Sequence, residues 1–144
     1  MPRKWLSRVE TPLYCGSVLK SDPSTWTDAR HRKGAAAESQ AADLLRREGY
    51  AIIEQRFRYR RHDIDLVARR GNTVVFVEVK ARSGDRFGSA SQSVTSFKQM
   101  QLVRAASAWL QRHGTPGDVA RFDVVAVQEG RLSWLQGAFR PGWR

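Results

Sequence analysis

Two runs of residues decide the fold of this chain: Asp63-Ile64-Asp65-Leu66-Val67 and Thr73-Val74-Val75-Phe76-Val77-Glu78-Val79-Lys80. Both runs are rich in Val, Ile and Leu, and the Gly71-Asn72 pair between them suits a tight turn. We therefore predict a β-hairpin that is symmetrical about this turn. In that register residue 70 faces 73, 67 faces 76, 65 faces 78 and 63 faces 80.

This register places four charged side chains on one face, because side chains alternate along a strand: Asp63, Asp65, Glu78 and Lys80. Asp65 and Glu78 are expected to lie directly opposite each other, with Cβ atoms roughly 4.5–5.5 Å apart. Two carboxylates at that separation repel each other unless a proton or a cation lies between them. Mg²⁺, which prefers oxygen ligands, is the cation that we expect there.

These charges could instead be ordinary solvated groups on the outer face of a hairpin. However, Val67 and Phe76 share the face with them. A face that combines large apolar groups with converging charges is typical of the wall of a cleft, so the pattern favours a site.

The charge balance indicates a polyanionic partner. The chain of 144 residues has 25 Lys and Arg against 14 Asp and Glu, a formal net charge of +11, which favours nucleic acid or an anionic membrane surface as the partner.

The length of the chain and its 41% of hydrophobic residues predict one soluble domain with a hydrophobic core. The single cysteine, Cys15, excludes an internal disulfide and a cysteine-based zinc cluster. No run approaches the roughly 18 apolar residues of a membrane span, and the N-terminus lacks the apolar region of a signal peptide, so we expect a cytoplasmic protein.

Two helices are expected on either side of the hairpin, from Asp28 to Glu48 and from about Ser93 to His113. Glu38 lies at the edge of the apolar stripe of the first helix. It is either a boundary charge or a third carboxylate that reaches the hairpin. Lys98 lies one turn before Leu102 of the second helix and faces inward. It is either a snorkelling side chain or a contact for a phosphate.

The first strand is expected between residues 50 and 61, where arginines alternate with aromatic residues: Arg56, Phe57, Arg58, Tyr59 and Arg60. A regular strand would put the three guanidiniums on one face and the two rings on the other. Basic groups interleaved with aromatic rings suit the backbone of a polynucleotide, although an edge strand protected by charge has the same pattern.

The order of elements predicts the architecture. Two more strands, Ala120 to Gln128 and Arg131 to Leu135, follow the second helix. Helix, three strands, helix and two strands predict an α/β fold, a mixed sheet of about five strands flanked by helices. We divide the chain into an N-terminal arm (1–27), a folded domain (28–136) and a basic C-terminal tail (137–144).

Several motifs follow one another in an order that is similar to a known family: Gly34-Ala35-Ala36-Ala37-Glu38, Gly49-Tyr50, Arg56 to Leu66, Val77-Glu78-Val79-Lys80-Ala81-Arg82, Phe87-Gly88, Lys98 and Arg121-Phe122-Asp123-Val124-Val125. Over about residues 30 to 128 the chain resembles the YraN family of small bacterial proteins. That family belongs to the restriction-endonuclease-like, or PD-(D/E)XK, superfamily.

The resemblance implies a metal-dependent nuclease. It implies Asp65 and Glu78 as ligands of Mg²⁺, for which Mn²⁺ can substitute, with Glu38 as a carboxylate beside the metal. It implies that Lys80 positions the attacking water or steadies the phosphate. We expect further basic residues to hold the backbone of the nucleic acid: Arg56, Arg58, Arg60, Arg82 and Lys98. Contacts of this kind predict weak sequence preference and strong salt dependence.

The chain also departs from the family pattern. The family usually has Gly-Glu where His62-Asp63 stands, Asn where Arg56 stands and often Glu where Gln92 stands. An alternative is a non-catalytic nucleic-acid-binding module. Its affinity for nucleic acid would not depend on Mg²⁺ and would be unchanged by Asp65→Ala. We expect DNA rather than RNA as the partner and no membrane, and a homodimer is compatible with the sequence.

Overall fold

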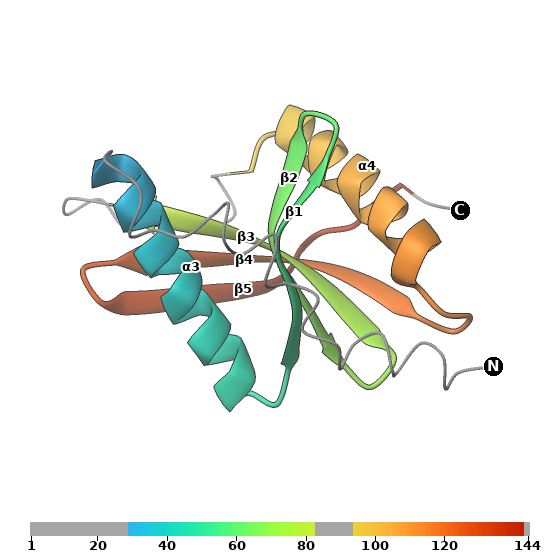
Figure 1. Ribbon diagram of the computed structural model, residues 1–144, viewed down its shortest axis with the longest axis horizontal. Coiled ribbons are helices and arrows are strands. Elements are labelled where there is room, and N and C mark those ends of the chain that lie inside the picture. Colours follow the sequence, from blue (N-terminus) through green and yellow to red (C-terminus); the bar gives the residue numbers. More distant parts are fainter. Residues whose placement is uncertain (1–28, 83–93, 143–144) are drawn as a thin grey trace.

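The five strands of the protein form one mixed sheet with the order β1-β2-β3-β4-β5 (Figure 1). The computed structural model describes residues 29–82 and 94–142. The elements are α3 (Ala29–Arg47), β1 (Ala51–Tyr59), β2 (His62–Arg70), β3 (Thr73–Arg82), α4 (Ser96–His113), β4 (Val119–Gln128) and β5 (Arg131–Phe139). The predicted α/β architecture is therefore confirmed, whereas the predicted N-terminal arm lies outside the described residues.

The sheet is buried on both faces, because one helix covers each of them. Alternate side chains of each central strand point to opposite faces, so Phe76 of β3 packs with the α4 side while Val77 packs with the α3 side. On the α4 side the fully buried Trp109 lies edge-on to Phe76, with ring centroids 5.8 Å apart. On the other side α3 packs through small residues such as Ala41, which lets this helix lie close to the sheet. Two separate apolar layers result.

The predicted register of the β2–β3 hairpin is confirmed over the pairs that the ladder contains. Arg70 pairs with Thr73 and Val67 pairs with Phe76. Gly71 has a φ of +61°, a left-handed conformation that glycine adopts without steric cost. The ladder ends at the pair Leu66 and Val77, just before the acidic residues.

The backbone of β1 is less regular than the predicted strand. Arg56 and Arg60 have φ values of +55° and +57°, and the β1–β2 register shifts between Ile52 and Glu54. Left-handed residues interrupt the pleat of a strand, so side chains no longer point strictly up and down. Phe57 and Tyr59 nevertheless both pack on the α4 side, as predicted, whereas Arg60 lies beyond the end of the strand.

Helix α4 connects two parallel strands, β3 and β4, and its start fixes the position of Lys98. The helix begins at Ser96 rather than Ser93, because the hydroxyl of Thr95 accepts a hydrogen bond from the Lys98 N–H at 3.2 Å and caps the helix. Farther along the helix, Trp109 Nε1 donates to Glu54 Oε2 at 2.7 Å. This bond ties α4 to β1.

Strand β5 continues to Phe139, four residues past its predicted end and into the predicted C-terminal tail. The ring of Phe139 stacks on Phe122 with centroids 4.7 Å apart. Gly137 has a φ of +62°, and its N–H donates to the buried Asp123 at 2.9 Å. These contacts hold the last residues of the strand on the sheet, so the tail begins later than predicted.

Candidate active site where β2 leaves β3

Asp65 lies at the point where β2 and β3 separate, immediately after the last pair of their ladder. The N–H of Val79 donates to Asp65 Oδ2 at 2.7 Å. The carboxylate thus takes the place of a main-chain acceptor that the departing strand no longer supplies. This bond fixes the Asp65 side chain against β3, at the residue that follows Glu78.

Glu78 is buried on the α4 face of β3, with only 7% of its side chain exposed. Lys80 Nζ lies 3.2 Å and Lys98 Nζ lies 3.7 Å from its Oε1. Its other oxygen, Oε2, is buried and has no hydrogen-bond partner among the described residues. A buried polar atom without a partner costs about 1–3 kcal/mol. The Oε2 atom is therefore suited to bind a cation or another ligand from outside the protein.

The surroundings of Asp65 disfavour its charged form. Burial, with a further contribution from the negative charge of Glu78, raises the pKa of Asp65 to about 8. The hydrogen bond from the Val79 N–H lowers the pKa of Asp65. The charge of Glu38 raises this pKa by less than Glu78 does, and the Lys98 ammonium lowers it. At neutral pH this pair is relieved by a proton or by a cation, as the sequence indicated.

Glu38 approaches the same region from α3. Its charge contributes to the raised pKa of Asp65, but its Oε2 accepts a hydrogen bond from Arg56 Nε at 2.8 Å. Throughout residues 29–82 and 94–142 no three Asp, Glu, His or Cys side chains form a group that could hold a metal ion. The orphaned oxygen of Glu78 and the crowding with Asp65 fit a cation, whereas Glu38 is not assembled with them.

The basic residues predicted to hold nucleic acid have different surroundings. Arg58 and Asp63 form an exposed ion pair of 3.0 Å across the β1–β2 hairpin. The guanidinium of Arg60 lies over the ring of Tyr59, 5.4 Å from its centroid. Arg82 is partly buried at the end of β3, and Lys98 is directed to Glu78. Their role in binding stays a prediction.

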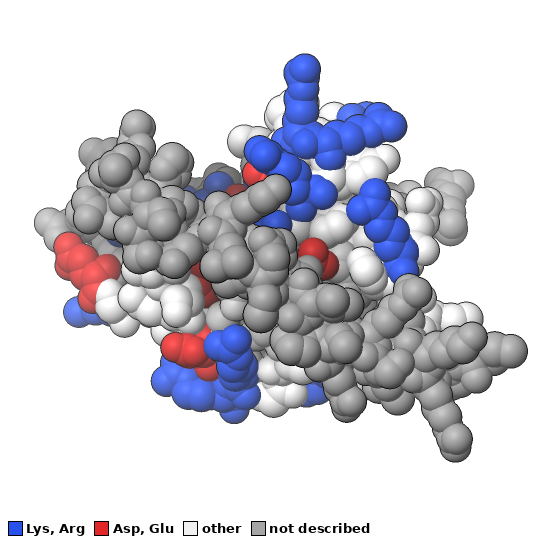
Figure 2. Space-filling model, in the orientation of Figure 1, with Lys and Arg blue, Asp and Glu red and all other residues white. Residues whose placement is uncertain are grey.

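Arg112 was not singled out from the sequence, although it lies beside these residues. Its guanidinium is 5.9 Å from the Phe57 centroid and 5.8 Å from the Tyr59 centroid. Its place in the last turn of α4, where basic residues are favoured by the helix dipole, was the available signal. Figure 2 shows Lys and Arg side chains gathered over the tip of the β1–β2 hairpin and over α4.

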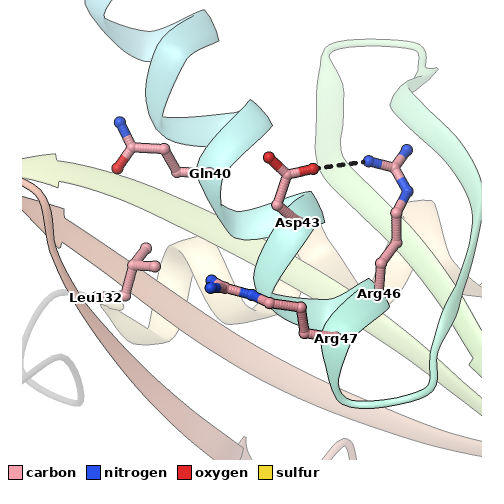
Figure 3. Close-up of a pocket in the computed structure, with 5 residues that line it drawn as sticks. All are labelled: Gln40, Asp43, Arg46, Arg47 and Leu132. Atoms are coloured by element: carbon pink, nitrogen blue, oxygen red, sulfur yellow. Dashed lines mark hydrogen bonds and ion pairs between the residues drawn. The ribbon is translucent and has the colours of Figure 1, made fainter.

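A separate open hollow of about 450 Å³ lies between α3 and β5 (Figure 3). It is lined by Gln40, Asp43, Arg46, Arg47 and Leu132. Asp43 and Arg46 in its wall already form an exposed ion pair of 3.1 Å. None of the acidic residues at the β2–β3 separation lines this hollow, so it does not form part of the candidate site.

The part of the chain that the structure describes contains no helix long and apolar enough to span a lipid bilayer.

The comparisons with known proteins point to one family. The model of the uncharacterised protein family UPF0102 matches residues 37–127. A UPF0102 protein of Bordetella avium is 42% identical over 114 residues, which are 79% of this chain and 79% of that protein. A relative from Symbiobacterium thermophilum is 44% identical over 113 residues (75% and 96%), and one from Halorhodospira halophila is 43% identical over 118 residues (82% and 95%). The chain therefore belongs to the uncharacterised protein family UPF0102, which is the YraN family that its sequence motifs resemble.

Proposed function

We propose that the protein is a metal-dependent nuclease that hydrolyses phosphodiester bonds of DNA with little sequence preference. The observation that carries this proposal is the buried, unpartnered Oε2 of Glu78 beside the crowded carboxylate of Asp65. The proposal also places the chain in the restriction-endonuclease-like superfamily and in the cytoplasm, where DNA and Mg²⁺ are available.

Asp65 and Glu78 are the residues that would hold the metal. A bound Mg²⁺ would supply positive charge at the phosphate and lower the pKa of a nucleophilic water. The hydrogen bond from the Val79 N–H keeps one oxygen of Asp65 fixed against β3, so the carboxylate does not have to be ordered when the metal binds. Because Glu78 Oε2 has no hydrogen-bond partner among the described residues, a metal could bind this oxygen without displacing a protein group.

Lys80 and Lys98 would act on the substrate. Both ammonium groups lie near Glu78 Oε1, and their side chains are 31% and 30% exposed. Each can therefore contact a phosphate oxygen at the mouth of the site while it remains close to the acidic pair. In this position Lys80 would offset the negative charge that develops on the phosphate as the bond to the leaving oxygen breaks.

The substrate class follows from charge. A net charge of +11 and the basic side chains over the hairpin tip and α4 favour a nucleic-acid backbone (Figure 2). Contacts to phosphates position the substrate without reading its bases, which is the reason to expect weak sequence preference.

Cleavage of a panel of labelled DNAs tests the proposal: single strand, nick, flap and four-way junction, each with Mg²⁺, with Mn²⁺ and with EDTA. Wild type should cut at least one of them in either metal and none in EDTA. Glu78→Gln should lose this activity. Asp43→Asn is the matched control, because it removes one carboxylate that is 64% exposed on α3. Cleavage that persists in Glu78→Gln would contradict the proposed site.

A non-catalytic nucleic-acid-binding protein is the second candidate, and the contact between Glu38 and Arg56 favours it, because it leaves only two carboxylates together. This alternative predicts DNA binding that is equal in Mg²⁺ and in EDTA and unaffected by Asp65→Asn, with no cutting under any condition. Fluorescence anisotropy with the same DNAs separates the two candidates.

A further inference from the structure

Arg56 of β1 binds Glu38 of α3, the carboxylate that comes nearest to completing a set of three acidic residues at the β2–β3 separation. We infer that Arg56 is a built-in competing cation, which holds Glu38 away from the candidate metal site and so weakens divalent metal binding. This inference rests on the proposed function, because it concerns the same site.

The contact joins two elements far apart in sequence. Arg56 Nε and Glu38 Oε2 are 2.8 Å apart, and their side chains are 31% and 15% exposed. A charge-assisted hydrogen bond of this length in partly buried surroundings is stronger than an exposed surface pair. By contrast, the Arg58–Asp63 pair of the same hairpin is 74% and 52% exposed. The first pair is therefore the one able to fix the position of a carboxylate.

The backbone directs Arg56 toward this role. Gln55 pairs with Leu66 and Phe57 pairs with Ile64, so the register places Arg56 opposite Asp65. Arg56 has a φ of +55°, a conformation rare for residues other than Gly, Asn and Asp. The arginine thus sits across the strand from one acid of the site while it binds another. The backbone therefore brings Arg56 to the acidic residues, and its guanidinium contacts Glu38.

The chemistry of the guanidinium decides what can displace it. An arginine side chain stays charged at every pH at which proteins are folded, so a rise in pH does not release Glu38. A phosphate group can do so, since it matches the fork of a guanidinium and binds it bidentately. Binding of a nucleic-acid phosphate to Arg56 would free Glu38, so DNA binding and metal binding should strengthen each other to the same extent.

Titration of full-length protein with Mn²⁺, followed by electron paramagnetic resonance, tests the inference without any measurement of activity. Arg56→Gln should bind Mn²⁺ roughly tenfold more tightly than wild type. Glu38→Gln in the wild-type background should change the affinity little, because Glu38 is already occupied. The double variant, with both Arg56→Gln and Glu38→Gln, should bind Mn²⁺ no more tightly than wild type. Arg56→Asn, which suits the left-handed backbone, should reproduce Arg56→Gln and guards against a folding defect.

Arg46→Gln is the matched control, because it removes one positive charge from an exposed pair on α3, and it should leave the affinity unchanged. If wild type binds Mn²⁺ and Arg56→Gln binds it no more tightly, the inference is overturned while the proposed metal site stands. A gain that persists in the double variant also overturns it, because the effect would then be one of general charge. If no folded variant binds Mn²⁺, both the inference and the proposed function fail.

Discussion

The carboxylate of Asp65 has two partners of different kinds. One oxygen accepts the main-chain N–H of Val79 at 2.7 Å, a contact that helps to define the end of the β2–β3 ladder. The same group is held close to Glu78, whose charge contributes to its raised pKa. The hydrogen bond from Val79 favours the charged carboxylate, which is the form that binds a cation, whereas burial and Glu78 favour the neutral form. The protonation of Asp65 therefore links folding to function.

Asp65 should make the metal-free protein less stable as the pH rises. Its pKa is raised from 3.8 to about 8 by burial and by Glu78. Below pH 3.8 the carboxyl is neutral in both states, and between pH 3.8 and about 8 it ionises first in the unfolded chain. In EDTA, stability should therefore fall across this window and level off above it, and the loss should exceed about 1 kcal/mol, which one pKa unit already represents.

Urea denaturation of wild type and Asp65→Asn at several pH values measures this effect. The variant should show a flatter pH dependence and higher stability at pH 8. Asp63→Asn changes the neighbouring, 52% exposed carboxylate and should behave as wild type. A wild-type slope that Asp65→Asn leaves unaltered would show that another group is responsible.

At the scale of elements, the position of α4 depends on one polar contact within an apolar face. Trp109 is fully buried against Phe76, yet its Nε1 donates to Glu54 Oε2 of β1 at 2.7 Å. Because the N-terminal turn of α4 carries Lys98, whatever orients this helix on the sheet also orients the lysine toward Glu78.

Trp109→Phe should destabilise the protein by about 2–4 kcal/mol. The substitution deletes part of a buried ring and leaves the partly buried Glu54 carboxylate without its donor. Thermal unfolding followed by circular dichroism measures the loss. Glu54→Gln is informative beside it, because the amide can still accept from the indole and should cost less. Equal losses for both variants would mean that the charge of Glu54, rather than the hydrogen bond, is what matters.

Sequence patterns predicted the elements that depend on local residues. The Gly71-Asn72 turn set the β2–β3 register, and the apolar periodicity set both helices, with ends within three residues of those observed. The left-handed backbone at Arg56 could not be predicted in this way, since its ion pair is made with Glu38 of another element. The extension of β5 likewise depends on Phe139 meeting Phe122, a contact between residues 17 positions apart.

The candidate site was likewise predictable where it depends on local strand geometry. Asp65 and Glu78 were brought together by strand alternation alone, and the structure places them as neighbours. Two features could not be predicted from the sequence: the Val79 N–H that donates to Asp65, and the ion pair between Arg56 and Glu38. Both are tertiary contacts made by groups that carry no motif. The catalytic role of the site and its metal remain proposals.

At the scale of the whole molecule, the excess of positive charge predicts that salt concentration is the main determinant of the proposed DNA binding. The net charge is +11, and Lys and Arg side chains lie together over the β1–β2 tip and α4 (Figure 2). Each phosphate that a basic side chain neutralises releases condensed counterions from the DNA. Affinity should therefore fall linearly with salt on logarithmic axes, whatever the sequence of the DNA.

If Arg56, Arg58, Arg60, Arg82 and Lys98 each contact one phosphate, the slope for duplex DNA should be about −4.5. Arg58→Gln should reduce its magnitude by about 1 without altering the preference among sequences. Fluorescence anisotropy at several salt concentrations measures the slope. Asp43→Asn, which retains every basic group, is the reference for a surface change. A slope that Arg58→Gln leaves at its wild-type value would remove that arginine from the interface.

The separation of β2 from β3 has a consequence for the behaviour of the protein at high concentration. Among the described residues, β3 beyond Val77 has β4 on one side and no ladder partner on the side from which β2 has departed. An open strand edge of this kind is a template for pairing with another chain, and natural proteins protect such edges with charge. Asp65 caps the first free N–H of this edge, and the charged Lys80 and Arg82 follow it. Asp65 therefore has a second role, in keeping this edge soluble, which does not depend on catalysis and which a non-catalytic relative would also need.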